Sequence, residues 1–229
     1  MGGSALTINL STADNLRSPI AEAFRSLRTN IQFSCIDKQI KSLVITSSIP
    51  GEGKSTIAFN LAVTIAQTEK KVLLIDTDLR KPTIHSYIQA EDFSGLTNII
   101  VQGINYREVL YSNINTKNLD VIISGPIPPN PSEILGSAKM RYLVERLEQE
   151  YDMIILDSPP VGMVTDAAVL STITDGVIVV CLTGKTKRED LGKSIDSLKK
   201  VNANLLGVVM NKAIYRKNSI YNAYYTKGK

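Results

Sequence analysis

The chain has 229 residues, which suits one large α/β domain or two very small ones. Hydrophobic residues make up 43% and charged residues 21%, as in an ordinary soluble globular protein, and two cysteines cannot form a disulfide framework. No apolar stretch approaches the roughly 20 residues that a membrane-spanning helix needs. We therefore expect a cytoplasmic protein. If it acts at a membrane, another molecule must hold it there.

The net charge of +4 is concentrated near the C-terminus, because residues 211–229 contain five basic residues and no acidic one. The rest of the chain is close to neutral, which argues against a nucleic-acid partner. The last 15 residues hold four of the nine tyrosines: Tyr215, Tyr221, Tyr224 and Tyr225. This stretch lacks helical or strand periodicity, so we predict a folded domain over 1–214 and a flexible tail over 215–229.

The predicted elements alternate along the chain. A helix is predicted over 19–33, where Ser18 supplies an N-cap and Pro19 opens the first turn. Strands are then predicted at 41–47, 71–76, 119–124, 151–157, 176–182 and 204–210, with helices between them at 54–68, 131–149, 165–173 and 187–201. Several strands are continuous apolar runs, typical of strands covered on both faces. The alternation predicts an α/β fold with a doubly wound, mainly parallel sheet in a single domain.

The helix over 131–149 has a recognisable start. Asn130 is predicted as its N-cap, Pro131 as its first residue and Glu133 as the partner in a variant of the capping box. A stiff proline-rich loop precedes it and follows a predicted strand. Such a loop lies at the carboxyl edge of the sheet, where ligands of open α/β folds bind.

The strongest local signal is the segment SSIPGEGKST over residues 47–56, between a predicted strand and a predicted helix. It matches the end of a P-loop, whose glycines let backbone N–H groups close around phosphates at a helix N-terminus. Lys54, an exposed loop lysine in this prediction, would reach the β- and γ-phosphates of ATP, and the Ser55 hydroxyl would bind Mg²⁺. The predicted nucleotide contacts in the loop are Gly51, Glu52, Gly53, Lys54, Ser55 and Thr56. The strict pattern has glycine where this chain has Ser48, so a glycine-rich turn without a ligand is the alternative.

Three acidic residues are predicted at the same edge of the sheet. Asp76 ends one strand, and Asp78 points the same way because side chains alternate along a strand. Two carboxylates at one strand tip repel unless a cation lies between them. Asp157 ends another strand, in a segment that resembles Walker B. Each residue alone could simply start a loop, but three of them beside a P-loop indicate a Mg²⁺–nucleotide site.

The P-loop, the second hydrophobic Asp-x-Asp-x-Arg motif at residues 76–80 (Walker A′) and the Asp-x-Pro-Pro motif at 157–160 together resemble the bacterial tyrosine kinases. The likeness is strongest to the CpsD/CapB type, a cytoplasmic kinase subunit for capsule and exopolysaccharide production on the MinD/ParA-like P-loop NTPase fold. It covers nearly the whole chain, including residues 125–133, residues 207–212 and the tyrosine-bearing tail. Walker A′ is its most specific element, because ordinary P-loop NTPases lack it.

The resemblance implies an ATP- and Mg²⁺-dependent protein-tyrosine kinase with roles for particular residues. Asp76 would position or deprotonate the attacking tyrosine hydroxyl. Asp78 and Asp157 would organise Mg²⁺ together with Ser55, directly or through water, and which of Asp76 and Asp78 acts as the base stays open. Asn211 matches a position that contacts adenine, with a strand-end turn residue as the alternative.

A second feature of the family is the Glu-x-x-Arg-x-x-Arg pattern formed by Glu22, Arg25 and Arg28. On a helix these three charges lie on one contiguous face. Such a face is usually just solvated, but the resemblance implies that it mediates ring-like self-association. In such a ring one subunit's tail enters its neighbour's active site. The predicted phosphoacceptors are Tyr215, Tyr221, Tyr224 and Tyr225.

The resemblance also implies partners. These are a transmembrane activator, whose cytoplasmic C-terminal segment completes the nucleotide site and recruits the kinase to the inner face of the plasma membrane, and a cognate tyrosine phosphatase. Two alternatives use the same motifs. A ParA/MinD-type ATPase switch would carry a signature lysine five residues before Lys54, where this chain has Ile49. A non-catalytic nucleotide-binding regulatory subunit would not need a tyrosine-rich tail.

Overall fold

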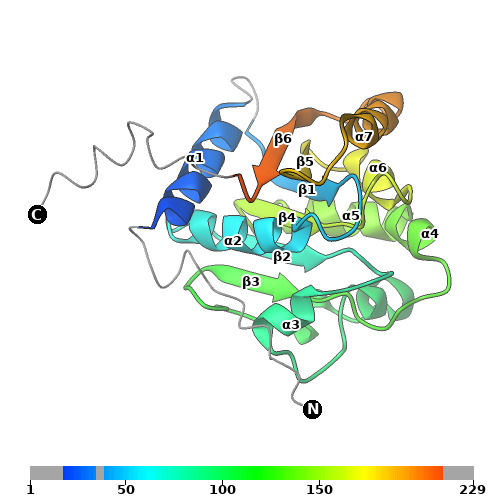
Figure 1. Cartoon of the computed structure of the whole chain (residues 1–229). Helices are drawn as coiled ribbons and strands as arrows, with labels where there is room; N and C mark the ends of the chain where they lie inside the picture. Colours follow the sequence, from blue (N-terminus) through cyan, green and yellow to red (C-terminus); the bar gives the residue numbers. More distant parts are fainter. Residues whose placement is uncertain (1–17, 35–38, 214–229) are drawn as a thin grey trace, which may run out of the picture.

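Six parallel strands form one sheet in the computed structural model, which describes residues 18–34 and 39–213 (Figure 1). The strands are β1 (Ser42–Ser47), β2 (Val72–Asp76), β3 (Leu119–Ile122), β4 (Met153–Asp157), β5 (Gly176–Leu182) and β6 (Leu205–Asn211). Their order across the sheet is β3-β2-β4-β1-β5-β6, and every pairing is parallel. The predicted α/β fold with a parallel sheet is confirmed.

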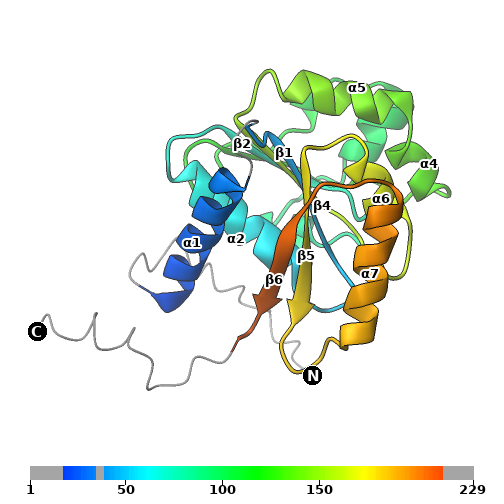
Figure 2. The same cartoon turned by 90° about the horizontal axis from the view of Figure 1, so that it is seen from above.

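Helices cover both faces of this sheet. They are α1 (Pro19–Phe33), α2 (Lys54–Ala66), α3 (Ile84–Ile88), α4 (Pro131–Leu135), α5 (Ala138–Leu147), α6 (Asp166–Ser171) and α7 (Arg188–Lys200), with a π-helical turn at Asn98–Gln102 and a 3-10 turn at Tyr106–Glu108. Helices α1 and α2 lie on one face, and α5, α6 and α7 on the other (Figure 2). Within the described residues, none of the helices is long and apolar enough to span a bilayer.

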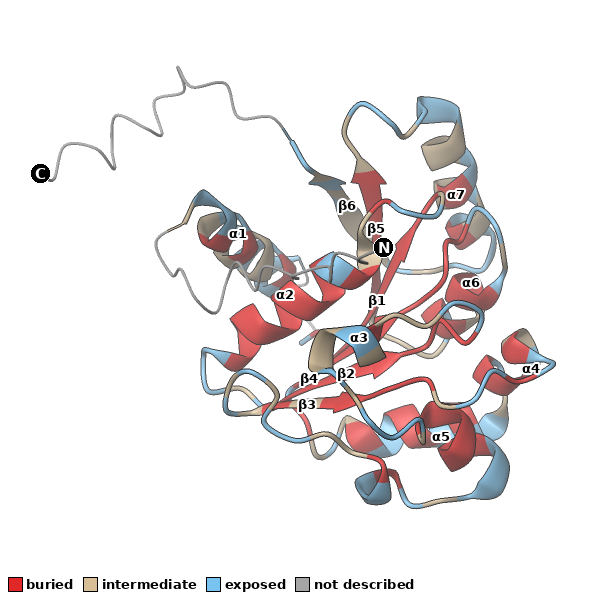
Figure 3. Ribbon diagram, turned by 60° about the horizontal axis from the view of Figure 1, so that its bottom comes forward, coloured by how far each residue is buried: buried red, intermediate tan, exposed pale blue. Residues whose placement is uncertain are grey.

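Each strand contributes alternate side chains to two separate cores. Leu43 and Ile45 of β1 pack in one core with α2, whereas Val44 packs in the other with α5 and α6. All three side chains have no exposed surface. Burial on both faces explains why the strands are continuous apolar runs rather than alternating ones, and Figure 3 shows the central strands as almost entirely buried.

Helix α1 begins at the predicted cap and packs on α2 rather than on the sheet alone. The Ala21 backbone N–H donates to the Ser18 hydroxyl at 3.1 Å. Phe24 and Ile31 are buried, with 7% and 4% of their surface exposed. Helix α2, enclosed between the sheet and α1, is therefore apolar around most of its circumference.

The single helix predicted over 131–149 is wrong, because two helices occupy this segment. Helix α4 ends at Gly136, and Ser137 takes an extended conformation and caps α5 by accepting the Met140 N–H at 3.1 Å. Asn130 stands at the N-cap and Pro131 opens the helix as predicted, but the predicted capping box does not form. The Asn130 side chain makes no cap bond and instead donates to the Glu133 carboxylate at 2.6 Å.

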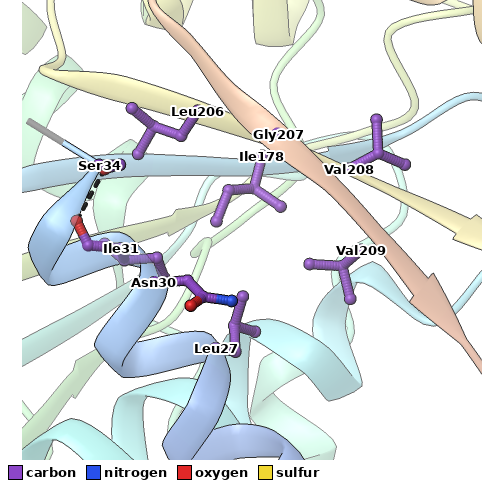
Figure 4. Close-up of a pocket in the computed structure, with 9 residues that line it drawn as sticks. All are labelled: Leu27, Asn30, Ile31, Ser34, Ile178, Leu206, Gly207, Val208 and Val209. Carbon is purple, nitrogen blue, oxygen red and sulfur yellow. Dashed lines mark hydrogen bonds between the residues drawn. The ribbon is translucent and has the colours of Figure 1, made fainter.

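An apolar pocket lies between α1 and the edge strand β6 (Figure 4). Leu27 and Ile31 line it from the helix, and Leu206 and Val209 from the strand. None of the predicted nucleotide-binding or catalytic residues lines this pocket. It is therefore separate from the chemistry that the motifs predict.

The docking of α1 predicts a contrast between its two phenylalanines. Phe24→Ala should lower the free energy of unfolding by about 3 kcal/mol, because it leaves a cavity against α2. Phe33→Ala, on the same helix but with 71% of its surface exposed, should change it by less than about 0.5 kcal/mol. Urea denaturation measures both values, and equal losses would contradict the packing described here.

Candidate active site

Sheet topology brings the predicted catalytic segments to one edge. Strands β2, β4 and β1 are consecutive neighbours, and all run parallel. Asp76 at the end of β2 is paired in register with Asp157 at the end of β4, and the P-loop follows β1. The P-loop, Walker A′ and Walker B-like segments thus leave the carboxyl edge side by side, where open α/β folds bind ligands.

The P-loop has the backbone that phosphate binding requires. Gly51 and Gly53 have φ of 81° and 90°, in the left-handed region that glycine favours. Gly53 is the N-cap of α2, which begins at Lys54. A side chain at Gly53 would collide with the Asn211 amide. The free N–H groups and the positive end of α2 therefore face the space that a phosphate would occupy.

The Glu52 side chain turns inward and shapes the loop. Its carboxylate accepts the Ser48 and Ile49 N–H groups at 2.7 and 3.0 Å, and the Thr186 hydroxyl donates to its other oxygen. Only 1% of Glu52 is exposed. The Asn211 amide donates to the Glu52 carbonyl at 2.8 Å, which brings the end of β6 against the loop. These bonds hold the loop in shape through contacts within the chain.

The Lys54 ammonium lies among the predicted acidic residues. Its Nζ is 2.9 Å from Asp78 Oδ2 and 3.7 Å from Asp157 Oδ1, and it donates to the Ser55 hydroxyl at 3.3 Å. Burial lowers the Lys54 pKa, but the Asp157 and Asp78 carboxylates outweigh burial, so the net pKa is raised and the ammonium stays charged. Only 11% of the side chain is exposed, so the expectation of an exposed loop lysine is wrong.

Asp76 is fully buried and organises the Walker A′ segment. Its two oxygens accept backbone N–H groups from Asp78 at 3.1 Å, Thr83 at 3.0 Å and Ile84 at 2.9 Å. Burial and the nearby Asp157 raise the pKa of this carboxyl. The bonds to Thr83 and Ile84 fix the start of α3 relative to the end of β2.

Asp157 is the least satisfied group of the site. It is completely buried, and neither carboxylate oxygen has a hydrogen-bond partner. Burial raises its pKa. A buried carboxylate without hydrogen bonds is costly, so its place beside Ser55 and Asp78 fits a site that completes itself with a cation.

The donor set suits Mg²⁺ bound mainly by nucleotide and water. Within residues 18–34 and 39–213, no group of three His, Cys, Asp or Glu side chains forms a protein-only metal site. Mg²⁺ typically keeps several waters and takes one or two carboxylates plus phosphate oxygens. Asp157, Asp78 and the Ser55 hydroxyl offer that limited set of ligands.

Several contacts here were not anticipated from the sequence. The Thr83 hydroxyl donates to Ser55 Oγ at 3.0 Å, and Thr56 Oγ1 and the Tyr87 hydroxyl are 2.8 Å apart. Thr186 reaches Glu52 from the loop after β5. Hydroxyl residues are common along the chain, in loops and in helices such as α3, so no signal in a single sequence marks Thr83, Tyr87 and Thr186 as partners.

The predicted oligomerisation residues lie apart from this site, on α1. Arg25 pairs with Glu22 of the same helix at 2.6 Å. The Arg28 guanidinium donates to the Thr64 carbonyl of α2 at 3.0 Å, so it contributes to the docking of α1. The predicted acceptors Tyr215, Tyr221, Tyr224 and Tyr225 lie outside the described residues.

The fold and the edge site define a P-loop nucleotide-binding protein. Residues 40–213 match the family described as the AAA domain. MinD of Aquifex aeolicus, at 22% identity and a TM-score of 0.63 over 76% of this chain and 70% of that one, shares the fold.

Comparison with known proteins narrows this class. The chain is 44% identical over 225 residues to the tyrosine-protein kinase YwqD of Bacillus subtilis, covering 98% of this chain and 94% of that protein. It is 40% identical to the putative tyrosine-protein kinase CapB of Staphylococcus aureus, covering 93% and 92%. The crystal structure of the chimerical protein CapA2B2 matches with a TM-score of 0.86 at 39% identity, covering 94% and 92%. The chain belongs to the bacterial tyrosine-protein kinase family, of the CpsD/CapB/YwqD type.

The unsatisfied Asp157 carboxylate predicts an unusual gain in stability. Asp157→Asn should raise the free energy of unfolding of the nucleotide-free protein by about 1 kcal/mol, because it replaces a buried charge that lacks hydrogen bonds. Asp166→Asn is the matched control: this side chain is equally buried, but its carboxylate is 2.9 Å from the Arg80 guanidinium.

The control should lose about 2 kcal/mol, because it weakens the charge-assisted hydrogen bonds that buried Asp166 accepts from the partly exposed Arg80 and from Ser132. Urea unfolding without nucleotide measures both variants. If Asp157→Asn loses as much stability as the control, Asp157 is not an unsatisfied carboxylate suited to bind a cation.

Proposed function

We propose that this kinase transfers the γ-phosphoryl group of ATP to protein tyrosines at the edge site, and that the tyrosines of its own tail are acceptors. The observation that supports this most is the position of the Lys54 ammonium. It lies directly after the P-loop glycines, 2.9 Å from Asp78 and 3.7 Å from Asp157. Phosphoryl transfer depends chiefly on positioning and on neutralising charge on the phosphates. Such a site provides both.

Nucleotide binding would redistribute the charges of the site. Lys54 would exchange Asp78 for the β- and γ-phosphates, which the N–H groups of Gly51 to Thr56 would also cradle. Ser55, Asp78 and Asp157 would hold Mg²⁺, which neutralises negative charge on the phosphates when it is bound. Asn211, bonded to the P-loop at the end of β6, is the proposed adenine contact.

The acceptor tyrosine must lose its proton as its oxygen bonds to the γ-phosphorus, while the bond from that phosphorus to the β–γ bridging oxygen breaks and ADP leaves. Asp76 and Asp78 are the two candidate proton acceptors. Both oxygens of Asp76 already accept backbone N–H groups. One oxygen of Asp78 becomes available once Lys54 turns to the phosphates, and it could then either accept this proton or bind Mg²⁺, so the choice between Asp76 and Asp78 stays open.

We also propose a cellular role for this chain from the family to which it belongs. We assign it to capsule or exopolysaccharide synthesis and export, with a kinase domain over 1–214 and an acceptor tail over 215–229. A transmembrane activator would supply a cytoplasmic segment and hold the kinase at the inner face of the plasma membrane, and a tyrosine phosphatase would reverse the reaction. Subunits would phosphorylate each other's tails within a ring.

Lys54→Met tests the reaction. Incubated with Mg-ATP, the wild-type protein should gain phosphotyrosine on Tyr215, Tyr221, Tyr224 or Tyr225, mapped by mass spectrometry. Lys54→Met should slow this labelling at least about 100-fold, because it removes the cation at the phosphates. Lys117→Met, at an exposed lysine outside the site, should label normally.

Each proposal has its own contradicting result in that experiment. Wild-type labelling of the Lys54 variant would remove Lys54 from catalysis. Label found mainly on Tyr142, an exposed tyrosine of the folded domain, would contradict the tail as acceptor. ATP hydrolysis without any phosphotyrosine would favour the alternative of an ATPase switch.

The ring proposal is tested on the charged face of α1. Because Arg28 also docks α1 on α2, the cleaner variant is Glu22→Ala with Arg25→Ala. It should give a monomer by light scattering and slow tail labelling between subunits. The matched control, Glu189→Ala with Lys193→Ala, removes an exposed helical ion pair of α7 and should leave the mass unchanged. If the α1 variant has the same mass as the wild-type protein, Glu22 and Arg25 form only a solvated face and the ring proposal is contradicted.

A further inference from the structure

One cluster of side chains joins three loops at the catalytic edge of the sheet. Arg80 lies in the loop after β2, Ser132 in the first turn of α4 beyond β3, and Asp166 at the start of α6 beyond β4. Strands β3, β2 and β4 are neighbours in the sheet. The three segments therefore leave the same edge next to one another, with Arg80 on the middle one.

The contacts of the cluster are specific and partly buried. Arg80 Nε and Nη2 donate to the two oxygens of Asp166 at 2.9 and 3.2 Å, and Nη2 also donates to Ser132 Oγ at 3.0 Å. The Ser132 hydroxyl donates to Asp166 Oδ1 at 2.5 Å. Asp166 has no exposed surface. A planar guanidinium that grips both oxygens of a buried carboxylate fixes orientation as well as distance.

The segment that Arg80 anchors is the one that carries Asp78. The Asp78 N–H donates to Asp76, and the Lys81 N–H donates to Asp78 Oδ1 at 3.0 Å, so residues 76–81 form a closed turn. Asp78 Oδ2 lies 2.9 Å from Lys54. Arg80 attaches this turn to the loops on both sides, two residues from the carboxylate that faces the P-loop.

We infer that Arg80, held by Asp166 and Ser132, is a positioning residue that sets the Asp78 carboxylate for phosphoryl transfer. The inference rests on the proposed role of Asp78. Arg80 itself need not touch the nucleotide. Small displacements of a reacting group slow enzymes strongly even when substrate binding is unaffected.

Arg80→Lys tests this role, since lysine keeps the charge but cannot bond both carboxylate oxygens in one plane. In the full chain, the maximal rate of tail phosphorylation should fall about tenfold, while the ATP concentration for half-maximal rate changes less than about twofold. Ser132→Ala should give a smaller fall and Ser132→Thr should restore the rate. Arg107→Lys is the control, because Arg107 pairs with Glu150 at an exposed place outside the site.

A double-mutant cycle with Asp78→Asn separates this inference from the proposed function. If Arg80 acts through Asp78, the Arg80→Lys/Asp78→Asn protein is no slower than Asp78→Asn alone. If the rate of the double variant falls by the product of the two single falls, the inference is overturned. A wild-type rate in Arg80→Lys would overturn it as well. If Arg80→Lys lowers the rate together with the ATP affinity and the melting temperature, the cluster only stabilises the fold and the inference is overturned. A wild-type rate in Asp78→Asn would instead overturn the proposed role of Asp78.

Discussion

The Lys54 ammonium neutralises carboxylates that the sheet itself forces together. Because β2 and β4 are parallel neighbours in register, Asp76 and Asp157 end at the same level and both are buried. Buried carboxylates that lie close together repel each other, and this raises their pKa. The Asp157 carboxylate contributes in this way to the raised pKa of Asp76. The P-loop follows the next strand, β1, and places a lysine where this charge is greatest. The site is therefore built around a cation that the chain itself supplies, 2.9 Å from Asp78 and 3.7 Å from Asp157.

That arrangement links nucleotide and metal binding. While Lys54 stays with Asp78, it partly compensates the buried charge of Asp157, whose oxygens still have no hydrogen-bond partner. In the proposed reaction, a nucleotide that drew Lys54 to its phosphates would leave the carboxylates without their cation, and a bound divalent ion would supply the missing positive charge. Each ligand would then favour the other by the same free energy, as thermodynamic linkage requires. Because Asp76, Asp78 and Asp157 are buried, this coupling would be stronger than between the same groups in water.

The sequence predicts those features that depend on local pattern. Continuous apolar runs identify the strands, and the P-loop and acidic motifs identify the edge where the site lies. It does not predict contacts between distant segments: the Thr186 hydroxyl on Glu52, the Arg28 guanidinium on the Thr64 carbonyl, or the burial of Lys54. The helix predicted over 131–149 fails for a different reason. Apolar periodicity continues past Gly136, so the pattern conceals a break that Gly136 and the capping serine Ser137 produce.

Helix α1 shows how much of a charged motif is already engaged within one chain. Arg28 bonds to the α2 backbone, and Arg25 pairs with Glu22 while both side chains remain 33% exposed. An exposed pair of this kind contributes at most about 1 kcal/mol. In the proposed ring, a neighbouring subunit that bound this face would exchange an intrachain pair for one between chains, so the net gain from the charges would be small. Such a contact would suit the proposed ring if it forms and separates again, because the negative charge added by phosphorylation of a tail tyrosine would have to overcome only a modest interface free energy.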